Sequence, residues 1–127
     1  MAVTVLVVDD SKLARIVAGK AIAALKPDWQ RVEAGSAAEA LAIVAAQQVD
    51  LAVLDFNMPD KDGLQLAAEL RALYPQMPIA IITANIQDEI IARARSLNAT
   101  FVGKPVTEAA ISGFISGAAL RLKKTGA

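Results

Sequence analysis

Short apolar runs alternate along this chain with longer segments in which apolar residues recur at helical spacing. The apolar runs are residues 3–8, 51–55, 79–83 and 101–103, and a shorter, more polar run covers residues 30–33. Uninterrupted apolar runs of this length are typical of parallel strands that are buried on both faces. Helical connections between such strands give a parallel sheet with right-handed crossovers. The pattern therefore predicts an α/β fold with five strands alternating with five helices.

The first two expected helices follow the runs at residues 3–8 and 30–33. The segment Lys26-Pro27-Asp28 ends the first helix, because proline restricts the residue before it. Ser36, with Glu39 three residues later, forms a capping-box pattern at the start of the second. The apolar positions expected to face the core are Leu13, Ile16, Val17, Ala21, Ala24 and Leu25 in the first helix and Leu41, Ala42 and Ala45 in the second.

The other three helices carry similar signals. Asp62 with Gln65 predicts a capped helix whose apolar face is Leu66, Ala67 and Leu70. The fourth helix is expected to start at Asn85 or Gln87 and to end at Leu97, with Asn98 in a left-handed conformation. Thr107 caps a fifth helix that runs to about Lys123. This last helix contains Gly113 and Gly117, which either allow a close helix contact or are merely tolerated.

The length of 127 residues suits one domain, residues 1–127. A hydrophobic content of 55% with 20% charged residues indicates a compact core. The apolar runs are shorter than the ~20 residues that cross a bilayer, and residues 1–8 lack a basic signal-peptide start. We therefore expect a soluble protein of the cytoplasm.

Charge and residue content exclude several chemistries. Lys plus Arg and Asp plus Glu each total 13, which argues against direct binding of nucleic acid or of an anionic membrane. Cysteine and histidine are both absent, so thiolate chemistry, a Ser-His arrangement and imidazole metal ligands are excluded. Any metal must be bound by oxygen ligands, which favours a hard cation such as Mg²⁺.

Polar residues follow the expected strands where each strand ends. Asp9 and Asp10 follow the first strand, Asp55 ends the third, and Thr83 and Lys104 end the fourth and follow the fifth. Ligand sites of open α/β sheets lie outside the carboxyl ends of the strands. Three carboxylates brought together there repel one another and require a divalent cation. With a hydroxyl and an ammonium nearby, the set could receive a phosphoryl group and neutralise its oxygens.

These residues resemble the receiver domain of two-component response regulators. The matching motifs are Val8-Asp9-Asp10-Ser11, Leu54-Asp55-Phe56-Asn57-Met58-Pro59 with Asp62-Gly63, Thr83-Ala84, and Phe101-Val102-Gly103-Lys104-Pro105. Four motifs in the right order, each at the end of a different strand, give a much stronger signal than any one alone. The resemblance implies a three-layer, flavodoxin-like fold with strand order 2-1-3-4-5, the order for which the chemotaxis receiver is a standard example.

The resemblance also implies a role for each residue. Asp55 would be the phosphoacceptor, Asp10 a direct Mg²⁺ ligand, Asp9 a ligand through water, and Asn57 a ligand through its backbone carbonyl. Thr83 and Lys104 would then hydrogen-bond to the phosphoryl oxygens.

Further features concern the switch and its timing. Phe101 would be the aromatic that turns inward when Thr83 moves toward the phosphoryl group. The Lys104-Pro105 peptide is expected to be cis, and Asn57 and Asn85 stand where residues tune the phosphoryl lifetime.

The implied function is a phosphorylation-operated switch rather than an enzyme. A sensor histidine kinase or a small phosphodonor would phosphorylate Asp55, and a phosphatase could reverse the reaction. The changed surface would recruit a separate target protein to the face formed by the fourth helix, the fifth strand and the last helix. Ile86 or Ile90 could mark that face, although core burial is the stronger expectation for at least one of them. A stand-alone regulator of the chemotaxis type is the first expectation, and a receiver cut from a longer regulator with DNA-binding or enzymatic output is the alternative.

Three other interpretations compete with the switch. Asp9-Asp10-Ser11 could simply cap a helix. A phosphohydrolase of the haloacid-dehalogenase type also uses an aspartate and Mg²⁺, but it needs a second aspartate where this chain has Asn57. A phosphate-independent interaction module could use the same fold, because a fold alone does not fix function.

Overall fold

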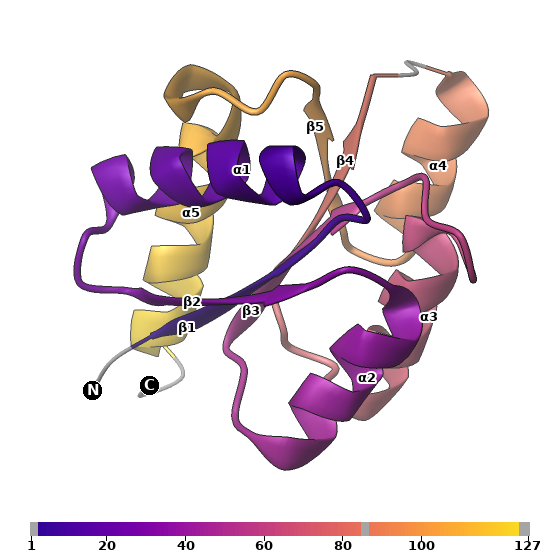
Figure 1. Ribbon diagram of the computed structural model, residues 1–127, viewed down its shortest axis with the longest axis horizontal. Helices are drawn as coiled ribbons and strands as arrows, with labels where there is room; N and C mark the ends of the chain where they lie inside the picture. Colours follow the sequence, from indigo (N-terminus) through magenta and orange to yellow (C-terminus); the bar gives the residue numbers. More distant parts are fainter. Residues whose placement is uncertain (1–2, 85–86, 125–127) are drawn as a thin grey trace.

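The computed structural model describes residues 3–84 and 87–124, which form one parallel sheet with helices on both faces (Figure 1). The strands are β1 (Thr4–Val8), β2 (Gln30–Ala34), β3 (Leu51–Asp55), β4 (Ile79–Thr83) and β5 (Thr100–Gly103). The helices are α1 (Lys12–Leu25), α2 (Ala37–Ala46), α3 (Gly63–Leu73), α4 (Asp88–Ser96) and α5 (Glu108–Lys124). The strand order is β2-β1-β3-β4-β5. The expected fold class and strand order are therefore confirmed.

The register of the sheet aligns the carboxyl ends of its strands. Val8 pairs with Leu54, Asp55 pairs with Ile82, and Thr83 pairs with Gly103. Every pairing is parallel, so the residues that end or follow these strands all emerge at the same edge of the sheet. That edge carries the polar residues singled out from the sequence.

Two hydrophobic layers hold the sheet between the helices. The α1 and α5 helices cover one face, and α2, α3 and α4 cover the other (Figure 1). Successive strand residues point to opposite faces, so Val5 and Val7 pack with the first layer and Leu6 and Val8 with the second. Because both faces are covered, β1, β3 and β4 are buried along their whole length. This burial explains why their sequences are apolar without alternation.

The expected buried faces of α1 and α2 are largely wrong. In α1, Leu13 is 71% exposed, and Ile16, Val17 and Ala24 are also exposed. Of the expected residues only Ala21 is buried and Leu25 packs half-buried against the core, whereas Ala18 and Ile22 supply the rest of the buried face. In α2 the buried residues are Ala37, Ala40 and Val44, and the expected positions Leu41, Ala42 and Ala45 are half-buried or exposed. Both helices are rich in alanine, which occurs on their buried and exposed sides alike, so apolar periodicity alone does not specify which side meets the sheet.

The third and fourth helices agree closely with the sequence. Asp62 accepts from the Gln65 N–H, and the Gln65 side chain accepts from the Asp62 N–H, which completes the capping box of α3. The α3 residues Leu66, Ala67 and Leu70 are fully buried. Gln87 is the N-cap residue of α4, whereas the alternative start at Asn85 lies outside the described residues. Asn98 has φ 55°, the left-handed conformation expected after this helix.

The two glycines of α5 do not serve a close packing contact within the described residues. A Cβ atom placed on Gly113 or Gly117 would meet nothing within 4 Å. Of the two interpretations, the structure therefore favours glycines that are tolerated on the helix surface. Within residues 3–84 and 87–124, no helix is both long enough and apolar enough to cross a bilayer.

Candidate functional site

Three carboxylates meet at the carboxyl edge of the sheet. Asp55 is the last residue of β3, Asp9 follows β1, and Asp10 comes next. One carboxylate oxygen from each lies within 4.8 Å of the other two. Asp55 and Asp9 are buried, at 3% and 7% exposure, and Asp10 is exposed. The adjacency of β1 and β3 therefore assembles the acidic cluster that the sequence predicts.

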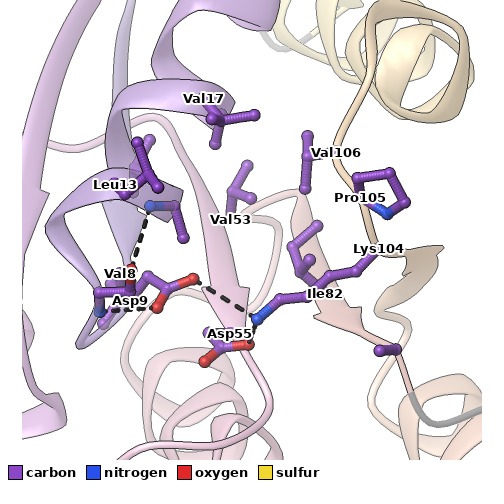
Figure 2. A pocket seen from close by; sticks show the side chains of 15 residues that line it. Val8, Asp9, Leu13, Val17, Val53, Asp55, Ile82, Lys104, Pro105 and Val106 are labelled. Atoms are coloured by element: carbon purple, nitrogen blue, oxygen red, sulfur yellow. Dashed lines mark hydrogen bonds and ion pairs between the residues drawn. The ribbon is translucent and has the colours of Figure 1, made fainter.

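Lys104 brings a positive charge to this cluster. Its Nζ lies 2.8 Å from Asp55 Oδ1 and 3.8 Å from Asp9 Oδ2 (Figure 2). The backbone N–H of Lys104 donates to the Thr83 carbonyl at 3.0 Å, which continues the pairing of β4 and β5 past the end of the strand. The Lys104-Pro105 peptide is cis, as the resemblance implied. Lys104 is thus directed toward the acids by its position at the end of β5.

Burial and charge shift the pKa values of these groups. Burial raises the pKa of Asp55, and the Lys104 ammonium offsets part of that rise. Burial also raises the pKa of Asp9, while the Ser11 backbone N–H, 2.9 Å from Asp9 Oδ1, opposes the rise. Burial lowers the pKa of Lys104, but the Asp55, Asp9 and Asp10 carboxylates together outweigh it and the net pKa is raised. The two buried acids are therefore costly to keep ionised without a further cation.

The donor set fits a hard divalent cation. Asp55 Oδ1 is buried and accepts no hydrogen bond within the part of the chain that is described, although it is ion-paired with Lys104. Three carboxylates at this spacing, one of them exposed to water, match the oxygen ligands and retained waters that Mg²⁺ prefers. A cation here would also relieve the repulsion between the acids. Asp9, Asp10 and Asp55 are therefore able to hold Mg²⁺.

Thr83 and Phe101 occupy the positions expected of them along the sheet. Thr83 ends β4 and is 1% exposed. Phe101 lies on β5, pairs with Ile81, and packs half-buried against the core on the α4 side. Thr83 thus lies at the acidic edge of the sheet, and Phe101 lies on the neighbouring strand, two residues before Gly103.

Two residues support the site through contacts that were not predicted from the sequence, although Gly63 belongs to a matching motif. Arg15 on α1 donates from Nη1 to the Asp9 carbonyl at 2.6 Å and pairs through Nε with Glu33 at 2.9 Å, which fixes the turn that carries the acids. A Cβ atom on Gly63 would overlap the Asp55 carbonyl oxygen, so only glycine fits there. A cationic residue one helical turn after Asp9-Asp10-Ser11 was a usable signal for Arg15, whereas no local pattern marks the packing at Gly63.

A model of the response regulator receiver domain family matches residues 5–116. The transcriptional regulatory protein GlrR of Escherichia coli is 38% identical over 82 residues, which cover 63% of this chain and 18% of GlrR. The sensor histidine kinase RcsC of Salmonella typhi is 30% identical over 126 residues, which cover 97% of this chain and 13% of RcsC. The chain thus spans less than a fifth of either relative.

Comparison with solved structures supports the same fold. A CheY-like response regulator receiver domain protein from Methanospirillum hungatei has a TM-score of 0.86 with this chain and is 21% identical to it. The superposition covers 98% of this chain and 99% of the other. At 21% identity, this structural similarity is evidence for the fold alone. The evidence for a family relationship is the match over residues 5–116.

Proposed function

Because this chain belongs to the response regulator receiver domain family of two-component systems, we propose that Asp55 accepts a phosphoryl group from a sensor histidine kinase. The observation that carries the proposal is the ion pair of Asp55 with Lys104 at 2.8 Å, set within a cluster of three carboxylates. A phosphoryl group on Asp55 would meet the ammonium that already faces this carboxylate. The family is one of signalling switches rather than of catalysts, and we expect this chain to act in the cytoplasm.

Mg²⁺ is the proposed cofactor, held by Asp9, Asp10, Asp55 and the backbone carbonyl of Asn57. When bound, it would neutralise charge on the phosphoryl oxygens. The chain's own groups have separate tasks: the Asp55 carboxylate attacks phosphorus, and Lys104 donates to a phosphoryl oxygen. Burial of Asp55 keeps competing water away from the acceptor.

Thr83 and Phe101 are the proposed switch residues. A shift of a two-state element from 1:99 to 99:1 requires about 5.5 kcal/mol of differential interaction. A hydrogen bond to a charged group contributes about 1.5 to 3 kcal/mol, so Thr83 and Lys104 together could supply most of that energy. Phe101 would follow Thr83 and alter the surface of α4, β5 and α5, where a target protein and a phosphatase are the proposed partners. If a target distinguished the phosphorylated and free forms of Thr83→Ala as sharply as it distinguishes those of wild type, the coupling scheme would be contradicted.

The expected partner surface is only partly described. Ile90 is 4% exposed and belongs to the core, so it does not mark that surface. Ile86 and Asn85 lie outside the described residues.

Two arrangements of the output are compatible with the family. The receiver could act as a separate protein of the chemotaxis type, or it could belong to a regulator with DNA-binding or enzymatic output. The second arrangement is favoured by GlrR and RcsC, in which the matching region is a minor part of the whole length. Sequencing the reading frame on both sides of the region decides between them.

The phosphoacceptor role is tested by intact mass after incubation with acetyl phosphate and Mg²⁺. We expect a single phosphoryl adduct that is lost in Asp55→Asn and in excess EDTA. Asp50→Asn is a control that changes an aspartate at the opposite end of β3. An adduct that persists in Asp55→Asn would refute the assignment. Multiple turnover of a phosphate monoester would instead support the phosphohydrolase interpretation.

A further inference from the structure

An apolar pocket of about 450 Å³ opens beside the acidic cluster. It lies between α1 and the segment after β5, over the ends of β3 and β4 (Figure 2). Leu13 and Val17 form one wall, Pro105 and Val106 form the other, and Val53 lies at its base. Two of the exposed apolar residues of α1 that the sequence wrongly placed in the core, Leu13 and Val17, thus border this pocket.

The pocket is continuous with the proposed phosphoacceptor. Asp55, Asp9 and Lys104 line the same cavity as the apolar walls. Asp55 is only 3% exposed, so a group held in this cavity lies next to a carboxylate that is otherwise nearly enclosed. Small-molecule sites commonly have volumes of about 300 to 1,000 Å³, with apolar walls and a few polar groups that fix orientation. The cavity has that size and composition.

The phosphoryl group alone does not explain the apolar part of the cavity. Its oxygens need the ammonium and the proposed cation, which are at the acidic end. The other end is complementary to an uncharged hydrocarbon group about as large as a short acyl chain or a phenyl ring. The ligand chemistry that matches both ends is an anion with a compact apolar tail, whose charged head lies beside Lys104.

We propose that this pocket accommodates the apolar tail of a small acyl phosphate, so that the receiver selects acyl phosphates with hydrocarbon tails over acetyl phosphate as direct phosphodonors. The inference rests on the proposed role of Asp55. In the reaction, an Asp55 carboxylate oxygen forms a bond to phosphorus while the bond between phosphorus and the acyl oxygen breaks. The electron pair leaves with the acyl group as a carboxylate, so no proton, oxidant or reductant is required.

The selectivity should increase with the length of the tail until the pocket is full. Burial of one methylene is worth up to about 0.8 kcal/mol, which corresponds to roughly a fourfold increase in rate. Allowing for partial burial, we expect the second-order rate constant for phosphorylation to rise about twofold to fourfold per methylene. Butyryl phosphate should therefore react about 4 to 15 times faster than acetyl phosphate, and benzoyl phosphate should also exceed it.

The test compares acetyl, butyryl and benzoyl phosphate as donors to the full chain in Mg²⁺, with phosphorylation followed by intact mass. Ala14→Leu fills the pocket from α1, where alanine and leucine are both good helix formers. Ala24→Leu makes the same change at an exposed position of the same helix, away from the pocket. We expect the tail preference in wild type and Ala24→Leu, and its loss in Ala14→Leu with the acetyl phosphate rate within twofold of wild type.

A second measurement needs neither metal nor phosphorylation. Benzyl alcohol, a neutral probe, is titrated into methyl-labelled protein in EDTA. We expect saturable shifts of the Val53 and Val106 methyl signals in wild type and in Ala24→Leu, and none in Ala14→Leu. Absence of those shifts in wild type overturns the pocket assignment.

The outcomes separate this inference from the proposed function. Equal rates for all three donors, with a normal adduct on Asp55, overturn the inference and leave the phosphoacceptor role intact. Suppose that the three donors react at equal rates and that Ala14→Leu no longer accepts a phosphoryl group from a phosphorylated kinase. The inference is then overturned, and the pocket is assigned to a side chain of the protein donor. No adduct from any donor refutes the phosphoacceptor role, and the inference fails with it.

Discussion

Neutralising Asp9 should stabilise the fold when no divalent cation is present. Asp9→Asn keeps the acceptor for the Ser11 N–H, which is 2.9 Å from Oδ1, and removes only the charge. Asp9 is 7% exposed, and its pKa is raised chiefly by burial. The substitution therefore removes a buried charge and retains the local hydrogen bond.

The size of the effect follows from the distances. At an effective dielectric constant of about 20, like charges no more than 4.8 Å apart repel by at least roughly 3.5 kcal/mol, and opposite charges 3.8 Å apart attract by roughly 4.4 kcal/mol. The attraction of Asp9 to Lys104 is thus nearly cancelled by its repulsion from Asp55 alone. Exposed Asp10 adds a smaller, screened repulsion, and the cost of burying the charge is not offset. We expect Asp9→Asn to raise the free energy of unfolding by about 1 to 2 kcal/mol at pH 7.

The assay is urea unfolding in EDTA, followed by fluorescence of Trp29, the single tryptophan, which is 8% exposed. Asp28→Asn, at an exposed aspartate away from the cluster, is the matched control. Because the pKa of Asp9 is higher in the folded state than in the unfolded state, the folded state binds the proton more tightly. The wild-type chain therefore loses stability as the pH rises above the usual carboxyl value of about 4, and the advantage of Asp9→Asn should disappear below that pH.

Added Mg²⁺ should reverse the ranking, because a bound cation stabilises the wild-type site more than the neutralised one. The electrostatic reasoning would be refuted if Asp9→Asn were no more stable than wild type in EDTA at pH 7 while the stability of Asp28→Asn was unchanged.

Three further predictions concern the elements that support the site. Gly63→Ala should cost about 1 to 3 kcal/mol in urea unfolding and slow phosphorylation of Asp55, because the added Cβ overlaps the Asp55 carbonyl oxygen; wild-type values for both would contradict that packing. Arg71→Met should cost about 2 to 4 kcal/mol and speed amide exchange in α4, because the guanidinium donates to five carbonyls around the ends of α3 and α4; unchanged exchange would argue against this link. Asp60 has a lowered pKa because its carboxylate accepts backbone N–H groups of α2, so Asp60→Asn should be less stable than wild type at pH 7. That difference should shrink as the pH falls below about 4, and a constant difference between pH 7 and pH 3 would exclude the carboxylate as its cause.

The sequence predicted the buried side of α3 better than the buried sides of the alanine-rich helices α1 and α2. The α3 helix was located by Asp62 and Gln65, whose side chains bond to nearby backbone, and its buried residues Leu66 and Leu70 stand out from polar neighbours. In α1 the exposed residues Leu13 and Val17 are as apolar as those that face the sheet. Periodicity identifies a helix, but it specifies the buried side only where the two sides differ in polarity.

The sequence identified the residues of the candidate site better than it identified which of them lie in contact. Asp55, Thr83 and Lys104 each end or follow an apolar run, so the local pattern placed them at strand ends. Their contacts depend on which strands are neighbours, and that order came from family resemblance. The spacing of Arg15 after Asp9-Asp10-Ser11 was a usable signal for its contact with the Asp9 carbonyl, whereas its pairing with Glu33 and the packing of Gly63 against Asp55 depend on the folded chain.

By itself, the sequence determined the alternation of strands and helices and the residue types at the carboxyl ends of the strands. Both are local properties, since strand propensity and capping act over a few residues. Only the tertiary structure decided that β3 lies between β1 and β4, which puts Asp55 beside Asp9 and 2.8 Å from Lys104. It also decided that Leu13 and Val17 border a pocket beside those charges. These outcomes depend on how whole helices and strands pack against one another, and no short segment contains that information.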